Sequence, residues 1–318
     1  YDKNNRLLST SGTSDYDDVT TVTYTYDNNG NRLSKNTDVR RKTDKSQTYY
    51  DTHTYTYDAS NRLTGYQYYK MDIRNDFEDE LTATYTYDPL GKRRTKHSDE
   101  TTTNFYWDGD NIVREKGLGT TTYYRGKDSV IAQIKGGTKN YYVYDGHGDT
   151  IALLDSNGFL TVQEKTYTAF GNAIEGTLST PFQYNGQYYD SYSGLYYLRN
   201  RYYDPSTGRF LTEDPAKDGL NWYIYCANDP VNFVDPWGLM PRADQTVNIM
   251  GRFVTPQASL YAKKYSEEMQ NLVNNNLGNL SDPEYLKAFD EINAKLDDIF
   301  AQDDRGEVSG TVLDVPVY

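Results

Sequence analysis

The chain has 318 residues, a formal net charge of −13, 34 Tyr and 24 Gly, and this composition favours strands and turns. An aromatic content of 15% excludes a disordered chain, and a single cysteine, Cys226, excludes an internal disulfide framework. The net negative charge argues against sequence-independent binding of nucleic acid through its phosphates. No apolar run approaches the 18 residues of a transmembrane helix.

A motif of about ten residues recurs along the first third of the chain. Tyr24–Leu33 returns as Tyr55–Leu63 and as Tyr85–Arg93, and Tyr1–Leu7 is a truncated copy. Alternating Thr and Tyr predict a strand, and Asp followed by Gly or Asn predicts a turn. When the copies are matched by residue type, Arg32 aligns with Arg62 at the start of the return strand. Each copy is therefore predicted to be a β-hairpin, and the hairpins must associate in a spiralling sheet to bury their aromatic faces.

Weaker signals continue the pattern. Tyr106–Gly109 and Val143–Gly148 are distant copies, and Gly117–Gly119 and Gly136–Gly137 are predicted hairpin turns. His53, His97 and His147 lack metal-ligand spacing and are predicted to be strand or turn residues. Cys226 closes the apolar run 221–226, which predicts a buried strand with a packed thiol.

These copies resemble the YD repeats of Rhs proteins, teneurins and the C component of insecticidal toxin complexes. Downstream, the chain is similar, nearly position for position, to the Rhs-associated core domain. The matching segments are Thr180–Asp190, Gly194–Pro205, Gly208–Pro215 and Asn228–Leu239. The resemblance implies a mainly β protein with a YD-repeat β-shell segment (1–179), a core domain that plugs the shell (180–239) and a variable C-terminal, effector-like region (240–318).

Two acids near the end of the core, Asp214 and Asp235, each precede a proline. Asp-Pro is a turn signal, so the residues alone favour two turn caps. The resemblance implies an aspartyl autoprotease instead, with Asp214 and Asp235 as the catalytic pair, Arg201 in support and the cut at Leu239–Met240. Such a pair needs one ionised carboxylate to activate water and one protonated carboxyl to polarise the scissile carbonyl. Because the substrate is tethered, a single turnover is feasible with modest catalytic groups.

The composition changes at Met240. Apolar stripes predict helices over 257–277 and 281–299, and residues 308–317 could form a short strand pair. This tail carries 7 Lys and Arg against 13 Asp and Glu, a net charge of −6, and contains no His or Cys. Its clustered acids are predicted to be a solvated helix end rather than metal ligands. They are Asp297, Asp298, Asp303 and Asp304. No metal or other cofactor is expected.

The sequence therefore favours the C-terminal part of a secreted or surface-delivered bacterial Rhs-type toxin. Its partners would be its own tail as enclosed cargo and a cognate immunity protein. The alternative is a non-enzymatic cell-surface adhesion protein whose repeats bind glycan. Because the chain starts at Tyr1 and not at Met, a targeting signal is expected to lie outside this fragment.

Overall fold

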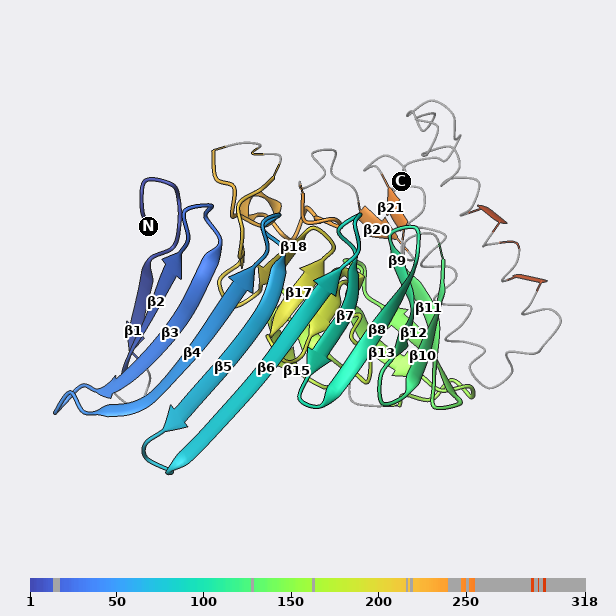
Figure 1. Ribbon diagram of the computed structural model, residues 1–318. Coiled ribbons are helices and arrows are strands. Elements are labelled where there is room, and N and C mark those ends of the chain that lie inside the picture. The colour runs from blue at the N-terminus through green and yellow to red at the C-terminus, as the bar shows by residue number, and fades with distance from the viewer. Residues whose placement is uncertain are drawn as a thin grey trace, which may run out of the picture. The chain divides into compact units, whose positions relative to one another are not determined.

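The computed structural model describes residues 1–13, 18–126, 129–161, 164–215, 217 and 220–239. It also describes the backbone of 247–249 and 252–254, and residues 287, 288, 291, 294 and 295. Within these residues the chain is mainly β (Figure 1). The strands of the repeat region are β1 (Ser9–Thr13), β2 (Asp18–Tyr26), β3 (Arg32–Arg41), β4 (Gln47–Tyr57), β5 (Leu63–Asp72), β6 (Phe77–Tyr87), β7 (Arg93–Ser98), β8 (Thr101–Asp108), β9 (Asn111–Lys116), β10 (Thr120–Arg125), β11 (Val130–Lys135), β12 (Thr138–Tyr144), β13 (Thr150–Leu154), β14 (Thr166–Tyr167) and β15 (Ala173–Glu175). The later elements are η1 (Tyr184–Gly186), β16 (Tyr188–Asp190), β17 (Leu195–Leu198), β18 (Arg201–Asp204), β19 (Arg209–Phe210), η2 (Cys226–Asn228), β20 (Val247–Ile249) and β21 (Arg252–Val254).

The first thirteen strands form one antiparallel sheet in which neighbours in the chain are neighbours in space. Smaller sheets are formed by β14–β15, β16–β19 and β20–β21. The chain divides into two compact units. The first holds Tyr1–Thr122, Gln187–Asn228 and Asp235–Pro241, and the second holds Tyr123–Gly186, Asp229–Val234 and Arg242–Tyr318. Strands β1–β9 and β16–β19, together with Asp214 and Asp235, belong to the first unit.

The repeats are hairpins, as the sequence predicts, and an aspartate organises each turn. Asp27 Oδ1 accepts hydrogen bonds from the backbone N–H groups of Asn29 and Asn31 at 2.9 and 2.8 Å. The residue three positions after the Asp has a positive φ, 82° at Gly30 and 59° at Asn61, which Gly and Asn tolerate best. Equivalent pairs of bonds form at Asp2, Asp58, Asp88, Asp145 and Asp155.

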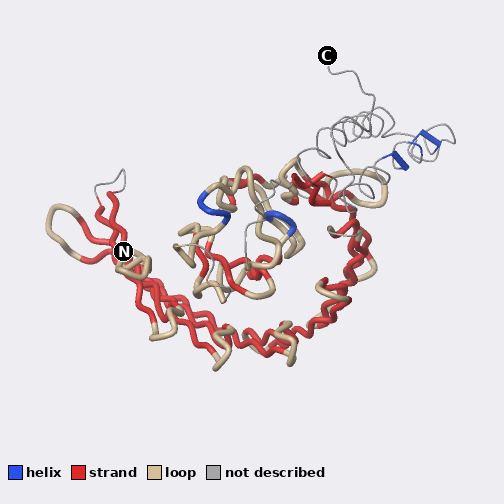
Figure 2. Tube along the Cα trace, turned by 90° about the horizontal axis from the view of Figure 1, so that it is seen from above, coloured by secondary structure: helices blue, strands red, loops and turns tan. Residues whose placement is uncertain are grey.

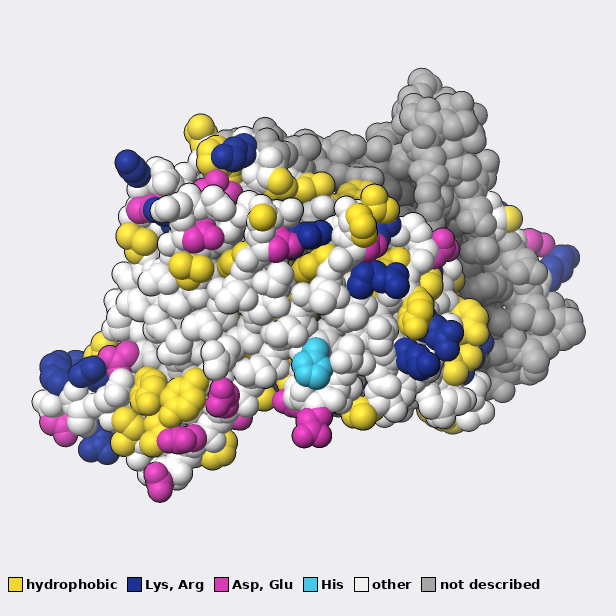
Figure 3. Space-filling model, in the orientation of Figure 1, with side chains coloured by type: hydrophobic (Ala, Val, Ile, Leu, Met, Phe, Trp, Pro, Cys, Tyr) yellow, Lys and Arg dark blue, Asp and Glu magenta, His cyan; other side chains and the backbone are white. Residues whose placement is uncertain are grey.

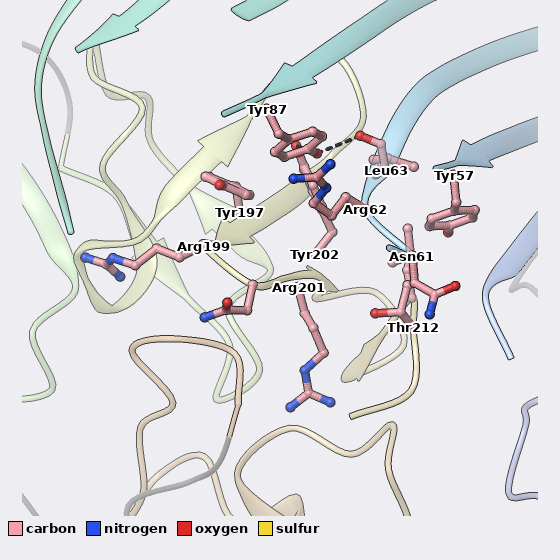
Figure 4. A pocket seen from close by; sticks show the side chains of 12 residues that line it. Tyr57, Asn61, Arg62, Leu63, Tyr87, Tyr197, Arg199, Arg201, Tyr202 and Thr212 are labelled. Carbon is pink, nitrogen blue, oxygen red and sulfur yellow. Dashed lines mark hydrogen bonds between the residues drawn. The ribbon is translucent and has the colours of Figure 1, made fainter. Parts of the chain in front are cut away.

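A β-bulge precedes the aromatic residue of the Tyr-Asp or Trp-Asp pair in five copies of the repeat. These aromatic residues are Tyr26, Tyr57, Tyr87, Trp107 and Tyr144. Bulges re-aim a side chain, and here the aromatic side chain reaches the previous copy of the repeat. The hydroxyl of Tyr87 donates to the carbonyl of Leu63 at 2.6 Å (Figure 4), and the indole N–H of Trp107 donates to the carbonyl of Arg93 at 2.9 Å. The same bond joins Tyr26 to Leu7, Tyr57 to Arg32 and Tyr144 to Val130. Consecutive hairpins are thus linked by side chains as well as by strand pairing.

The structure corrects the alignment of Arg32 with Arg62. Arg62 lies four residues after its Asp, as Asn31 does, and both donate to the second carboxylate oxygen of that Asp, at 2.7 and 2.8 Å. Arg32 lies one residue further along and aligns with Leu63, and both are buried. Matching by residue type failed because the first turn contains one additional residue before its Arg.

The sequence analysis missed two turns of the same kind. Asp155 Oδ1 accepts from the N–H groups two and four residues on. At Thr168 a hydroxyl replaces the carboxylate and accepts from the N–H of Asn172 at 3.1 Å, while the preceding Tyr167 donates to the carbonyl of Thr150 at 2.9 Å. Neither turn has a Tyr-Asp pair, so only the glycine three positions on, Gly158 or Gly171, marks it in the sequence.

Two buried ion pairs hold the β16–β19 sheet on the concave side of β1–β9 (Figures 1 and 2). Arg32 Nη1 lies 2.6 Å from Asp204 Oδ2, and Arg93 Nη1 lies 3.1 Å from Asp190 Oδ2. Both arginine side chains are fully buried. The guanidinium of Arg93 also lies 4.4 Å from the ring centroid of Phe105, within cation–π range. Because a buried charge is costly unless paired, the two arginines fix where this sheet sits.

The opposite face of the sheet carries threonine and serine pairs. Thr25 Oγ1 lies 2.7 Å from Ser34 Oγ, and Thr86 Oγ1 lies 2.6 Å from Thr95 Oγ1. On the face in Figure 3, uncharged polar side chains and backbone predominate over the strands, and hydrophobic side chains gather in small groups.

The minor predictions have mixed outcomes. The three histidines lie in strands or turns, and both glycine-rich turns close hairpins, as predicted. Cys226 is buried, but the predicted strand 221–226 is wrong, because only Ile224 forms a β-bridge, with Arg209, and Cys226 begins η2 at a φ of 48°.

Most of the tail lies outside the described residues, including the predicted helix over 257–277, the strand pair over 308–317 and the four clustered acids. The five described residues of the predicted helix 281–299 are helical. The β20–β21 hairpin was not predicted. Across the part of the chain that the structure describes, no helix has the length and apolar character needed to cross a membrane.

The Arg32–Asp204 pair gives a testable prediction. Burial alone would raise the pKa of Asp204, but Arg32 and Lys35 hold it at about 2, so the pair stabilises the fold above pH 3.8 and its contribution is lost as the pH falls through about 2. Asp204→Asn leaves Arg32 buried without a counter-charge and should lower the free energy of unfolding at pH 7 by about 3–5 kcal/mol in urea titrations. The double variant Arg32→Leu/Asp204→Asn should recover part of that loss, because Leu63 is buried at the equivalent position. As a control, Arg40→Gln removes an ion pair whose side chains are 51% and 36% exposed, and should change stability by less than about 0.5 kcal/mol.

Candidate functional site

Arg201 lies at the centre of the candidate site. It opens β18, directly after the two-residue turn that follows β17, and its side chain is only 3% exposed. Its guanidinium carbon lies 3.7 Å from the ring centroid of Phe210, which covers one side of the charge. Nη1 donates to the carbonyl of Trp222 at 2.9 Å, and Nε donates to the carbonyl of Gly238. The remaining nitrogen, Nη2, faces the acids.

Both predicted acids contact this one nitrogen. Asp214 Oδ2 lies 3.2 Å from Arg201 Nη2, and Asp235 Oδ2 lies 3.7 Å from it. The two carboxylates are 21 positions apart in the sequence and are both buried. The structure therefore brings together the three residues that the resemblance selects.

Asp235 is also a turn residue, as the motif predicts. Its Oδ1 accepts the backbone N–H of Leu239 at 3.1 Å, four residues on, and Gly238 has a φ of 66°. Asp88 makes the same turn in the repeats, with Lys92 as the donor and a φ of 85° at Gly91. The difference lies in the second oxygen. Asp235 Oδ2 is buried and, among the described residues, has no hydrogen-bond partner.

The surroundings of Asp235 shift its ionisation toward the protonated form. Burial raises the pKa of Asp235 and the charge of Asp214 adds to the rise, while Arg201 and the N–H groups of Leu239 and Gly238 oppose it. One guanidinium can neutralise only one of two carboxylates. The buried group of three is therefore neutral overall when one acid holds a proton, and Asp235 is the acid whose environment favours that state.

Gly238 lies where a side chain would not fit. An added Cβ would lie 3.1 Å from both Cβ and O of Leu198 and 3.3 Å from Cβ of Arg201. The absence of a side chain thus allows the chain that contains Leu239 to pass close to Arg201. Met240, on the other side of the predicted cut, lies outside the described residues.

A small pocket of about 10 Å³ adjoins Arg201 (Figure 4). Such a volume is about the smallest that can hold one water molecule. Neither Asp214 nor Asp235 lines it, and the guanidinium of Arg201 points away from the labelled tyrosines. The pocket is therefore separate from the carboxylates.

The sequence analysis missed two contributors, the ring of Phe210 and the carbonyl of Trp222. Phe210 lies inside the matching segment Gly208–Pro215, whereas Trp222 lies outside all the matching segments. The pairing of β18 with β19 sets Phe210 opposite Tyr203, which is two residues from Arg201 and therefore on the same face of the strand. This pairing is the signal that could have found the ring.

The chain is similar to several known proteins. A family model described as Teneurin YD-shell matches residues 1–231. The chain is 34% identical over 280 residues to the tRNA3(Ser)-specific nuclease WapA of Bacillus spizizenii, covering 75% of this chain and 12% of that protein. It is 30% identical over 258 residues to the double-stranded DNA deaminase toxin A of Burkholderia cenocepacia, covering 66% of this chain and 17% of that protein. The Tc holotoxin pore of Photorhabdus luminescens aligns with a TM-score of 0.48 and 19% identity, over 71% of this chain and 13% of that chain.

The chain therefore belongs to the YD-shell family, as an Rhs/YD-repeat protein of the polymorphic-toxin type. It spans less than a fifth of the length of these relatives.

Two glycines at equivalent turn positions test the packing at the site. Gly91→Ala places a Cβ in open space and should lower the free energy of unfolding by about 1 kcal/mol, the cost of the positive φ. Gly238→Ala adds close contacts with Leu198 and Arg201 and should lower the free energy of unfolding by about 2–3 kcal/mol. Both variants are measured by urea titration in a chain that is not cleaved, such as Asp235→Asn. Equal costs would show that the chain at Gly238 is not closely packed against the hairpin.

Proposed function

We propose that the core region of this chain cleaves its own backbone between Leu239 and Met240, with Asp214 and Asp235 as the catalytic pair. The segment from Met240 onward is then released as an effector. One observation carries the proposal: Asp235 Oδ2 is buried, lacks a hydrogen-bond partner among the described residues, and faces the guanidinium that also binds Asp214.

The pairing assigns a role to each acid. Asp214 has the shorter contact with Arg201 and is the ionised member, which takes a proton from the attacking water. Asp235, protonated, polarises the carbonyl of Leu239 and then gives its proton to the departing amine of Met240. Water thus adds its hydroxyl to the carbonyl carbon of Leu239, the C–N bond breaks, and a carboxyl group and an amine are formed.

The tether supports a single turnover. The N–H of Leu239 is bound to Asp235 Oδ1 at 3.1 Å, so the residue before the proposed cut is held against one of the two acids. Holding substrate and catalytic groups together supplies effective concentrations of about 10⁵ M or more in favourable cases.

We also propose that the β-shell encloses the tail before the cut, and that a cognate immunity protein binds the released effector. The whole protein would be secreted or surface-exposed in bacteria. The named activities of the relatives, tRNA cleavage and DNA deamination, support a toxic role for the tail, but they are carried by proteins far longer than this chain.

The adhesion alternative receives less support. The tyrosine hydroxyls next to the repeat aspartates are bonded to carbonyls of neighbouring copies, and those aspartates are occupied by the turns. The repeat motif itself therefore offers little to a glycan.

Substitution of either acid should stop the cut. Asp235→Asn and Asp214→Asn should each slow self-cleavage by at least about 100-fold, measured by intact mass during cell-free synthesis, because each removes one half of the acid–base pair. Asp88→Asn, at the same kind of turn in the repeats, should leave the cut unchanged. If both site variants are cleaved at the parental rate, the two acids act only as turn caps.

The pH dependence has a definite sign. Because the pKa of Asp235 is raised, its protonated form persists above pH 3.8, and the cleavage rate should fall as the pH rises through that higher value. Because the reaction is intramolecular, the rate at each pH should be independent of protein concentration. A rate that keeps rising with pH would exclude a protonated Asp235.

A further inference from the structure

The two-residue turn between β17 and β18 holds the chain just before the proposed cut. Three consecutive residues, 199–201, donate hydrogen bonds to three consecutive carbonyls, 236–238. The bonds are Arg199 Nη1 to Pro236 O at 2.5 Å, Asn200 Nδ2 to Trp237 O at 3.0 Å and Arg201 Nε to Gly238 O. The backbone N–H of Asn200 also lies 3.3 Å from the carbonyl of Trp237.

Arg199 is braced on its other side. Its Nε donates to the carbonyl of Asp110, in the turn between β8 and β9, at 2.8 Å, and its Nη1 lies 3.2 Å from Gln187 Oε1. In Figure 4, Arg199 and Arg201 leave the hairpin in different directions. The guanidinium of Arg199 thus connects the large sheet to the segment that precedes the cut.

The backbone conformation of Arg199 is itself unusual. Its φ is 62°, a left-handed value that favours Gly or Asn and costs a residue such as Arg about 1 kcal/mol. A turn selected for stability alone would carry Gly or Asn at this position. The arginine is explained if the hydrogen bonds of its side chain offset the cost of this backbone conformation.

We propose that Arg199 and Asn200 are positioning residues for self-cleavage. They fix residues 236–238 against the turn, so that the carbonyl of Leu239, and not that of a neighbouring residue, is the one presented to the acids. This rests on the proposed function. The N–H of Leu239 is bound to Asp235, so the backbone is held at four successive residues up to the cut. These three hydrogen bonds end on backbone carbonyls, so they can set the register whatever side chain stands at Trp237, which is 36% exposed.

The test separates positioning from folding. Arg199→Asn removes the guanidinium but keeps a residue that tolerates a positive φ, so the turn itself should be preserved. Asn200→Ala removes one exposed amide. Cleavage is followed by intact mass during cell-free synthesis of the full chain, and melting temperatures are compared on an Asp235→Asn background. Arg40→Gln and Asn104→Ala, at exposed positions away from the site, are the matched controls.

Arg199→Asn and Asn200→Ala should slow the cut about 10- to 100-fold at unchanged melting temperature, and should produce fragments that begin on either side of Met240. Arg199→Lys should restore part of the rate, because an ammonium group can still donate to the carbonyl of Pro236. A shifted cut position is a result that lower stability alone would not give.

Parental rate and a single cut position in both variants would overturn the positioning role. If the parent is also cut and Asp235→Asn is not, this result overturns the positioning role and leaves the proposed self-cleavage standing. A parent chain that remains uncut would overturn the proposed function, and the positioning role with it.

Discussion

The buried ion pair between Arg32 and Asp204 is the interaction on which the rest of the first unit depends. Arg32 begins a strand of the large sheet, and Asp204 ends β18, the four-residue strand that starts with Arg201. Because neither charge can be left alone in the interior, the pair fixes β18, and with it the guanidinium at the site. Arg93 and Asp190 repeat the arrangement at β16, so the small sheet is fixed at two of its strands.

The chemistry of the site arises from where an ordinary turn is placed. Asp88 and Asp235 start the same Asp-Pro-x-Gly turn, and each accepts the N–H four residues on. Asp88 lies at the end of a repeat strand, with Leu90 in its turn 82% exposed, whereas Asp235 is 1% exposed and adjoins Arg201 and Asp214. Burial beside a second acid raises the pKa of this turn residue, although the nearby cation opposes the rise. The turn and catalytic interpretations of Asp235 are therefore compatible, since each uses a different oxygen.

Much of the fold could be predicted from the sequence, because the repeat encodes it locally. Period-two alternation and the Asp-to-Gly spacing define each hairpin without long-range information. One buried position of the repeat is occupied by Arg32 in one copy and by Leu63 in the next. This difference could not be predicted, because Arg32 is paired with Asp204, which lies 172 residues away. The site was selected by resemblance. Spacing alone favoured turn caps for Asp214 and Asp235, and their common contact with Arg201 depends on the pairing of β17 with β18. The strand expected at Cys226 failed because an apolar, aromatic run there packs as a turn, with a single bridge at Ile224.

The most direct test of the central claim is synthesis of the chain in water enriched in oxygen-18, followed by mass analysis of both fragments. Hydrolysis by the acid pair predicts a fragment that ends at Leu239 with one heavy oxygen in its new carboxyl group, and a second fragment that begins at Met240 without label. Formation of both should stop in Asp235→Asn. An intact chain in a folded sample, or a cut that persists in Asp235→Asn, would contradict the account.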